Sequence, residues 1–146
     1  MSLQDRLVRA SRAPVVGRLA YLWLKSLGVE FPQSVQFGDR LELAHGAVGL
    51  VVHRRTRIGT GVTLMPGVVI GRSDSYVAET AESTGGVVIG DRVTVGAGAK
   101  VLFRSGQDLV VADGTIVGAN AVLLESTGAD EIWAGNPAKR VGTRTA

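Results

Sequence analysis

A six-residue period runs through the middle of the chain and limits its possible folds more than any other feature. Five hexads carry it, and each begins with an aliphatic or aromatic residue: Phe37–Glu42, Ile58–Thr63, Ile89–Thr94, Val95–Lys100 and Val117–Val122. This period fits neither the 3.6-residue repeat of an α-helix nor the alternation of a half-buried strand. It is typical of a parallel β-helix, in which each hexad forms one flat side and one corner of a coil.

The hexad also predicts which side chains form the core. In Ile58–Thr63 we expect Ile58 to point into the coil and Val62, four residues later, to lie near the corner, where space is limited. The 20 glycines suit corners that need a positive φ or a close approach of two backbones. Because one hexad cannot bury its apolar side alone, several coils must stack. The prediction is a single all-β fold, a parallel β-helix of hexapeptide repeats.

The composition narrows the possible functions. Hydrophobic residues make up 45% of the 146 residues but aromatic residues only 5%, so the core must consist of Val, Ile, Leu and Ala. There is no cysteine, and the two histidines, His45 and His53, are too few for a three-histidine zinc site in one chain. We therefore expect no metal, which argues against a hydratase. The net charge of +3 comes from scattered cations, so we expect no nucleic-acid partner, although a small anionic ligand would suit it.

Two parts of the chain differ in pattern. We expect residues 1–28 to form a short helical segment and residues 29–146 to form the β-helix. Pro14 is expected to start the main helix and Gly28 to end it. Two interpretations of this segment stay open: it caps the open end of the coils, or its basic residues hold it on a membrane surface. Its apolar residues lie mostly on one helical face: Leu7, Leu19, Leu22, Trp23 and Leu27.

The N-terminal segment shows neither a membrane span nor a signal peptide. The longest apolar stretch, Ala13–Leu27, is interrupted by Arg18 and Lys25. Met1–Ala13 carries charges and lacks an apolar core of the signal-peptide type. We therefore expect a cytoplasmic protein with no integral membrane segment.

Three interruptions of the repeat are expected to carry function, because long insertions in a repeat array commonly do. They are His45–Leu50, the polar segment Arg72–Gly86, and Arg104–Asp108.

Several segments, in this order, resemble the hexapeptide-repeat acyltransferases, and in particular their serine acetyltransferase-like branch. The resemblance spans roughly residues 29–142 and implies a left-handed β-helix. It also implies acetyl-CoA as co-substrate, a small-molecule acceptor, and a homotrimer with its active sites between adjacent subunits. The segments that carry it are Leu43-Ala44-His45, Gly49–Val52, Gly96–Val101, Gly118–Val122 and Ala134–Lys139.

The resemblance assigns the catalytic role to His45, as the base that deprotonates the acceptor hydroxyl. Imidazole suits this role because its pKa lies near neutrality. The alternative is a corner histidine with no role. Glu30 matches a family carboxylate that contacts the acceptor or the histidine, and the alternative is a solvent-facing residue. We interpret His53 as a surface corner, with a role at a second site across the trimer as the other interpretation.

The resemblance also implies a coenzyme A site along the outer groove of the later coils. Small residues there let the pantetheine arm approach the backbone, although corners require small residues in any case. The matching positions are Gly98, Ala99, Gly118 and Ala119, while Lys139 and Arg140 are expected to meet the anionic nucleotide end.

Departures from the family pattern bear on the acceptor. Ala44 replaces an acidic residue before the histidine, and Gly85-Gly86 replaces an Arg-His pair that holds the substrate carboxylate. A carboxylate needs a charged partner to bind specifically. We therefore predict an O-acetyltransferase that favours a sugar or polysaccharide-precursor hydroxyl, with Arg72 and Tyr76 as acceptor-binding candidates. Two alternatives remain: a serine O-acetyltransferase of cysteine biosynthesis, and a non-catalytic trimeric scaffold.

Overall fold

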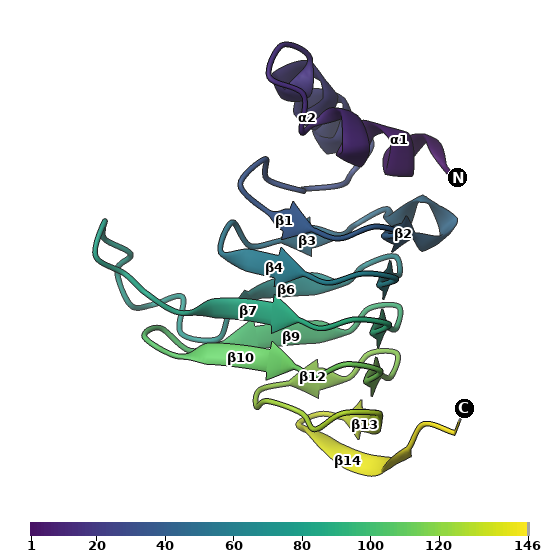
Figure 1. Cartoon of the computed structure of the whole chain (residues 1–146). Coiled ribbons are helices and arrows are strands. Elements are labelled where there is room, and N and C mark those ends of the chain that lie inside the picture. Colours follow the sequence, from purple (N-terminus) through teal and green to yellow (C-terminus); the bar gives the residue numbers. More distant parts are fainter. Residues whose placement is uncertain (146) are drawn as a thin grey trace.

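The computed structural model describes residues 1–145, which are mostly β with two short helices (Figure 1). Helices α1 (Leu3–Ala10) and α2 (Gly17–Ser26) precede the strands, and a short 3₁₀ turn, Ala44–Ala47, follows the second strand. The strands are β1 (Gln36–Phe37), β2 (Glu42–Leu43), β3 (Val51–Val52), β4 (Thr56–Ile58), β5 (Thr63–Leu64), β6 (Val69–Arg72), β7 (Gly86–Ile89), β8 (Thr94–Val95), β9 (Lys100–Phe103), β10 (Asp108–Val111), β11 (Ile116–Val117), β12 (Val122–Leu123), β13 (Glu131–Gly135) and β14 (Ala138–Thr143).

The strands form three sheets that the chain visits in turn. Sheet 1 has the order β1-β4-β7-β10, sheet 2 the order β2-β5-β8-β11-β13-β14, and sheet 3 the order β3-β6-β9-β12. All pairs are parallel except β13–β14, which form an antiparallel hairpin at the C-terminal end. Because each of the strands β1 to β9 pairs with the strand three further on, the chain runs as stacked three-sided coils (Figure 1).

The core consists of three rows of inward side chains, one per sheet. The pairing registers bring residues of successive coils side by side, and every member is buried, as the hexads predict. Such rows supply the burial that one coil cannot supply alone. The rows are Phe37, Ile58, Ile89 and Val111 in sheet 1; Leu43, Leu64, Val95, Val117 and Trp133 in sheet 2; and Val52, Ile70, Val101 and Leu123 in sheet 3.

The helical segment differs from the prediction of one main helix that starts at Pro14. The structure has two helices, and α2 starts three residues later, at Gly17. The residues after Pro14 form a turn in which the Gly17 N–H donates to the Ala13 carbonyl at 2.8 Å. The sequence analysis missed α1, whose Ser2 and Asp5 form a capping box that satisfies N–H groups at the helix start.

A large side chain in the middle of a row is expected to contribute strongly to stability. Leu64 on β5 is fully buried, with a neighbour in the coil on each side. Leu64→Ala removes this packing and leaves a cavity, so it lowers the free energy of unfolding by about 2–5 kcal/mol. Urea denaturation followed by circular dichroism measures the change. The matched control is Leu124→Ala, because Leu124 is 50% exposed; an equal loss in both variants would contradict the stacked core.

Candidate active site

His45 lies on the 3₁₀ turn between β2 and β3. It is exposed and has a φ of +52°, in the left-handed region that a residue with a Cβ seldom adopts. Such conformations cost on the order of 1–3 kcal/mol. Arg40 and Arg92, among others, share this conformation, so the positive φ marks a turn and does not by itself mark a functional site. His45 lines a shallow hollow of about 400 Å³ with residues from the N-terminus and from the corner before β2, among them Ser2, Asp5, Arg9 and Arg40.

Asp5 ties helix α1 to the strand that leads into His45. The carboxylate is buried, and its Oδ1 accepts from the Leu43 N–H at 2.8 Å. Its Oδ2 accepts from the backbone N–H of Ser2 at 2.6 Å and from the Ser2 hydroxyl at 2.8 Å. The helical segment therefore fixes the position of the His45 turn.

Glu30 lies in a different hollow from His45. It forms an isolated parallel bridge with Val51 and lines a hollow of about 440 Å³ that also includes His53, Gly71 and Glu79. Within residues 1–145 no hydrogen bond joins Glu30 to His45. One copy of the chain thus does not bring the two predicted catalytic residues together.

The structure instead gathers His53 with Glu79, which comes from the Arg72–Gly86 insertion. Glu79 accepts from Arg54 at 2.9 Å and from Arg55 at 2.7 Å, and its Oε1 lies 4.0 Å from His53 Nε2. The imidazole also stands edge-on to Phe103, with 5.0 Å between the ring centroids. Its Nδ1 accepts from the Arg55 N–H at 3.1 Å, so Nε2 is the ring nitrogen next to Glu79.

The cluster shifts two pKa values. Burial is the main reason that the pKa of His53 lies below its ordinary value, and the charge of Glu79 opposes this only in part. The hydrogen bond from Arg54 is the main cause that lowers the pKa of Glu79. His53 is half-buried rather than a plain surface corner. The only signal in the sequence was its position directly after a strand, next to two arginines.

Arg72 and Tyr76, the two residues predicted to bind the acceptor substrate, lie on the same insertion but differ in how firmly other residues hold their side chains. Arg72 donates to the Ser105 hydroxyl and to the Val77 carbonyl, each at 3.0 Å. Ser105 also bonds to the buried Asp74, so the base of this loop is fixed on the neighbouring corner. Tyr76, in contrast, is 83% exposed. Arg72 is thus a structural residue in this copy of the chain, while Tyr76 is free to meet a ligand.

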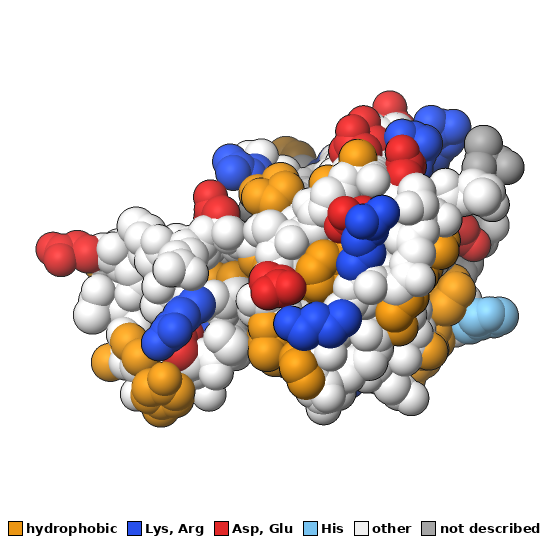
Figure 2. Space-filling model, turned by 90° about the horizontal axis from the view of Figure 1, so that it is seen from below, with side chains coloured by type: hydrophobic (Ala, Val, Ile, Leu, Met, Phe, Trp, Pro, Cys, Tyr) orange, Lys and Arg blue, Asp and Glu red, His pale blue; other side chains and the backbone are white. Residues whose placement is uncertain are grey.

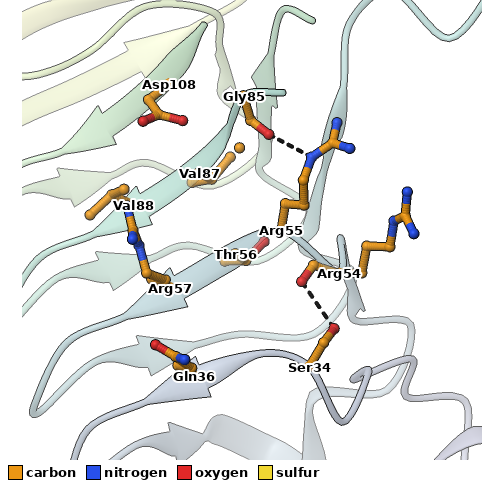
Figure 3. Close-up of a pocket in the computed structure, with 11 residues that line it drawn as sticks. Ser34, Gln36, Arg54, Arg55, Thr56, Arg57, Gly85, Val87, Val88 and Asp108 are labelled. Carbon is orange, nitrogen blue, oxygen red and sulfur yellow. Dashed lines mark hydrogen bonds between the residues drawn. The ribbon is translucent and has the colours of Figure 1, made fainter. Parts of the chain in front are cut away.

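The Gly85-Gly86 pair, where the family has cationic side chains, lines a hollow of about 300 Å³ on sheet 1 (Figure 3). Three arginines, Arg54, Arg55 and Arg57, line the same hollow. Arg55 is fixed there, because its Nε donates to the Gly85 carbonyl at 2.6 Å (Figure 3). Arg54 and Arg55 are paired with Glu79, and Asp108 lines the same hollow, so Arg57 is the one of the three arginines that makes no ion pair within residues 1–145.

The predicted coenzyme A positions lie mostly on the outer surface of the later coils. Gly98 is half-buried with a φ of +71°, Gly118 is half-buried and Ala119 is exposed. The Ala99 side chain points into the core, and its backbone N–H and carbonyl are both paired. Gly98, Gly118 and Ala119 are therefore at least partly accessible from outside, whereas the Ala99 side chain is not.

Lys139 and Arg140 are exposed on β14 and lie near acidic partners. Lys139 Nζ is 3.8 Å from Glu125, and Arg140 Nε is 3.5 Å from Glu131. Exposed pairs of this kind contribute little, so both cations remain accessible to an anionic group.

Two absences hold for residues 1–145, which the structure describes. Neither helix in that part of the chain is long and apolar enough to cross a membrane. In the same residues, no three His, Cys, Asp or Glu side chains are arranged to hold a metal ion.

The lowered pKa of His53 predicts a pH dependence of stability. Between the ordinary histidine pKa of about 6.5 and the lower folded value, the unfolded chain binds a proton that the folded chain does not. Stability therefore falls as the pH is lowered through this window, and His53→Gln reduces the fall. Urea midpoints from pH 7.5 to 5.5 measure it, in a range above that where Glu79 and Asp74 become protonated. His45→Gln controls for loss of one imidazole; equal slopes in the wild type and His53→Gln would contradict the prediction.

Comparison with known proteins gives relatives of one kind. The chain is 36% identical over 75 residues to the serine acetyltransferase of Helicobacter pylori, a match that covers 51% of this chain and 40% of the relative. It is 37% identical over 75 residues to the serine acetyltransferase of Staphylococcus xylosus, with coverages of 51% and 32%. The chain thus spans less than half the length of these relatives. No family model matches it.

Solved structures of serine acetyltransferases share the fold. The enzyme of Neisseria gonorrhoeae superposes with a TM-score of 0.77 and 24% identity, over 98% of this chain and 55% of that one. A complex of the Brucella abortus enzyme with coenzyme A gives a TM-score of 0.76 and 21% identity, with coverages of 97% and 55%. The resemblance to serine acetyltransferase-like hexapeptide-repeat acyltransferases is therefore confirmed, in sequence over about half of the chain and in fold over nearly all of it.

Proposed function

We propose that the chain is an O-acetyltransferase that transfers the acetyl group of acetyl-CoA to the hydroxyl of a small acceptor. The observation that carries the proposal is the exposed His45, held in a left-handed turn at a coil corner of a chain that resembles serine acetyltransferases. The coenzyme A complex of a structure with the same fold supports the choice of donor.

In the proposed reaction His45 acts as a general base. Its imidazole takes the proton of the acceptor hydroxyl as the oxygen attacks the thioester carbonyl. The tetrahedral intermediate then collapses, the C–S bond breaks, and the proton passes to the coenzyme A thiolate. The chain contains no cysteine, so the reaction is written as direct attack without a thiol nucleophile.

The accessible small residues suit an extended acyl donor. Gly98, Gly118 and Ala119 leave room for the pantetheine arm beside the backbone, and Ala99 contributes its small volume rather than a contact. Lys100, whose ammonium donates to the Gly98 carbonyl, adds a cation beside this path. Lys139 and Arg140 are the cations proposed for the nucleotide phosphates.

We propose a homotrimer with its sites between subunits, as the resemblance implies. Support comes from the separation of the candidate residues: His45, Glu30 and the arginines near Gly85 line three different hollows of one chain. A second copy is needed to bring an acceptor-binding surface to His45. In this arrangement Glu30 of one copy contacts the acceptor beside His45 of another.

Three further features belong to the same proposal. The coils wind left-handed, residues 1–28 act as a cap, and residues 29–146 act as the acyltransferase domain. The likeness in fold to serine acetyltransferases supports the first, and the Asp5–Leu43 hydrogen bond supports a fixed cap. A cytoplasmic location stays a prediction.

The comparisons favour serine as acceptor over the sugar hydroxyl that the sequence analysis preferred. A physical argument adds to this support, because Arg57, which makes no ion pair within residues 1–145, lines the hollow beside Gly85-Gly86, where an acceptor carboxylate needs positive charge. A sugar hydroxyl remains the second candidate. Two observations favour it. The Arg72 guanidinium is engaged with Ser105 and Val77 and so is not free to bind a carboxylate, and the exposed phenol of Tyr76 can bond to a hydroxyl.

The first test of this proposal concerns the base. His45→Ala is expected to lower turnover by about 100-fold or more, the usual contribution of a general base. Release of the coenzyme A thiol from acetyl-CoA measures the rate. His53→Ala is the comparison, because that imidazole stands against Phe103 in another hollow. A normal rate in His45→Ala, or a loss confined to His53→Ala, would reassign the base.

The second test concerns the acceptor. In a panel of serine, hexoses, amino sugars and nucleotide sugars, serine is expected to give the highest kcat/KM. Arg57→Gln should raise the KM for serine by about 10- to 100-fold, since a charge-assisted hydrogen bond contributes about 1.5–3 kcal/mol. Arg18→Gln, on helix α2, is the matched control. A sugar with the highest kcat/KM would favour the second candidate, and no thiol release with any acceptor would favour a non-catalytic scaffold.

A further inference from the structure

Helix α2 presents an unpartnered apolar stripe to solvent. Val15, just before the helix, and Leu19, Leu22 and Trp23 within it follow the spacing i, i+4, i+7 and i+8 of one helical face. They are 87%, 61%, 51% and 60% exposed, respectively. The opposite face is buried, and its Leu24 belongs to the core cluster. The stripe therefore takes no part in the packing of the helix against the coils.

The charge around this stripe has one sign. Arg18 and Lys25 are exposed on the same helix and fall beside Leu22 on the helical circumference. The segment from residue 6 to residue 29 has no acidic residue at all, and its five cations are Arg6, Arg9, Arg12, Arg18 and Lys25. No salt bridge found in residues 1–145 involves any of them.

The opposite end of the molecule differs. Seen from the β14 end, Figure 2 shows acidic and basic side chains intermixed over the surface, with apolar side chains between them. The two helices lie together at the other end of the coil stack (Figure 1). Uncompensated positive charge and exposed large apolar residues therefore coincide at the helical end.

We propose that α2 docks the protein on the surface of a bilayer that contains anionic lipid. A helix with an apolar stripe bordered by Lys and Arg lies in the headgroup region, with its apolar side chains among the upper acyl chains. Anionic headgroups supply the missing negative charge and attract the nearby cations. The ten residues of α2 are too few to cross a bilayer, so the helix lies along it.

A second copy of the chain is a less suitable occupant of the same stripe. Symmetric pairing of two α2 helices would bring Arg18 and Lys25 of both copies together with no acidic residue of this segment to offset them. A lipid surface avoids this repulsion. The docking also leaves the sides of the coils free, where the hollows lined by Glu30 and by Arg57 lie, and the hollow of His45 is lined by residues of helix α1 and none of α2.

Vesicle binding by the full chain tests the proposal. Vesicles of phosphatidylcholine with about one third phosphatidylglycerol are compared with pure phosphatidylcholine vesicles by flotation and by tryptophan fluorescence. Trp23 is the exposed reporter, while Trp133 is only 7% exposed and gives a constant background. We expect binding and a blue shift with the anionic vesicles only, both weakened at ~0.5 M NaCl, where charges are screened.

Two variants separate the parts of the proposed surface. Leu19→Ser with Leu22→Ser removes apolar contact, and Arg18→Glu with Lys25→Glu reverses the charge. Each pair is expected to weaken partitioning by about tenfold or more. Val141→Ser, at a 65% exposed position on β14, is the matched control and should bind as the wild type does. All changed residues are exposed, and circular dichroism verifies the fold.

Three results would overturn the proposal. They are the absence of binding to anionic vesicles, equal binding to both kinds of vesicle, and binding that both variant pairs retain. Sedimentation velocity tests the other possible occupant of the stripe, a second copy of the chain. If Leu19→Ser with Leu22→Ser lowers the oligomeric state while vesicle binding is absent in the wild type, the stripe is an interface between copies.

Discussion

The stacking of inward side chains is the constraint on which the rest of this structure depends. A residue such as Leu64 is buried only because Leu43 and Val95 occupy the same place in the coils on either side. A shift of register by one residue would turn every inward side chain outward. Extra residues are therefore accommodated only at corners, and the three interruptions of the repeat are where the chain leaves the coil and where chemistry-bearing side chains gather.

The corners hold their chemistry-bearing side chains by different interactions. At the His45 corner a short turn holds one imidazole in the open, while Asp5 from helix α1 fixes the preceding strand. At the corner after β3, a carboxylate from the long insertion folds back on two arginines and keeps a neighbouring imidazole half-buried. The first imidazole is exposed to solvent, whereas the second is part of a charge network that fixes the insertion. This contrast is why His45 is proposed as the base and His53 as a comparison.

The two ends of the coil stack are closed in unlike ways. At the C-terminal end the β13–β14 hairpin covers the last coil, and the Trp133 indole, at the end of an inward row, donates to Glu131 at 2.8 Å. At the N-terminal end, helix α2 buries Ala20 and Leu24 but leaves Leu19, Leu22 and Trp23 in solvent. Covering the first coil requires one face of a helix only. The other face of α2 is free to take another role, because it exposes large apolar side chains that a face in contact with water alone does not need.

The sequence by itself determined the coil architecture, because a six-residue period and the supply of small aliphatic residues leave few other ways to bury Ile58, Ile89 and Val117. It also located the insertions and both histidines. It did not predict helix α1, the half-burial of His53, or the arginines that surround Gly85-Gly86. These depend on residues far apart in the chain, such as Asp5 with Leu43 and His53 with Glu79. Periodicity reports which way a side chain points in its own coil, but only the stacked structure decides which distant charge stands next to it.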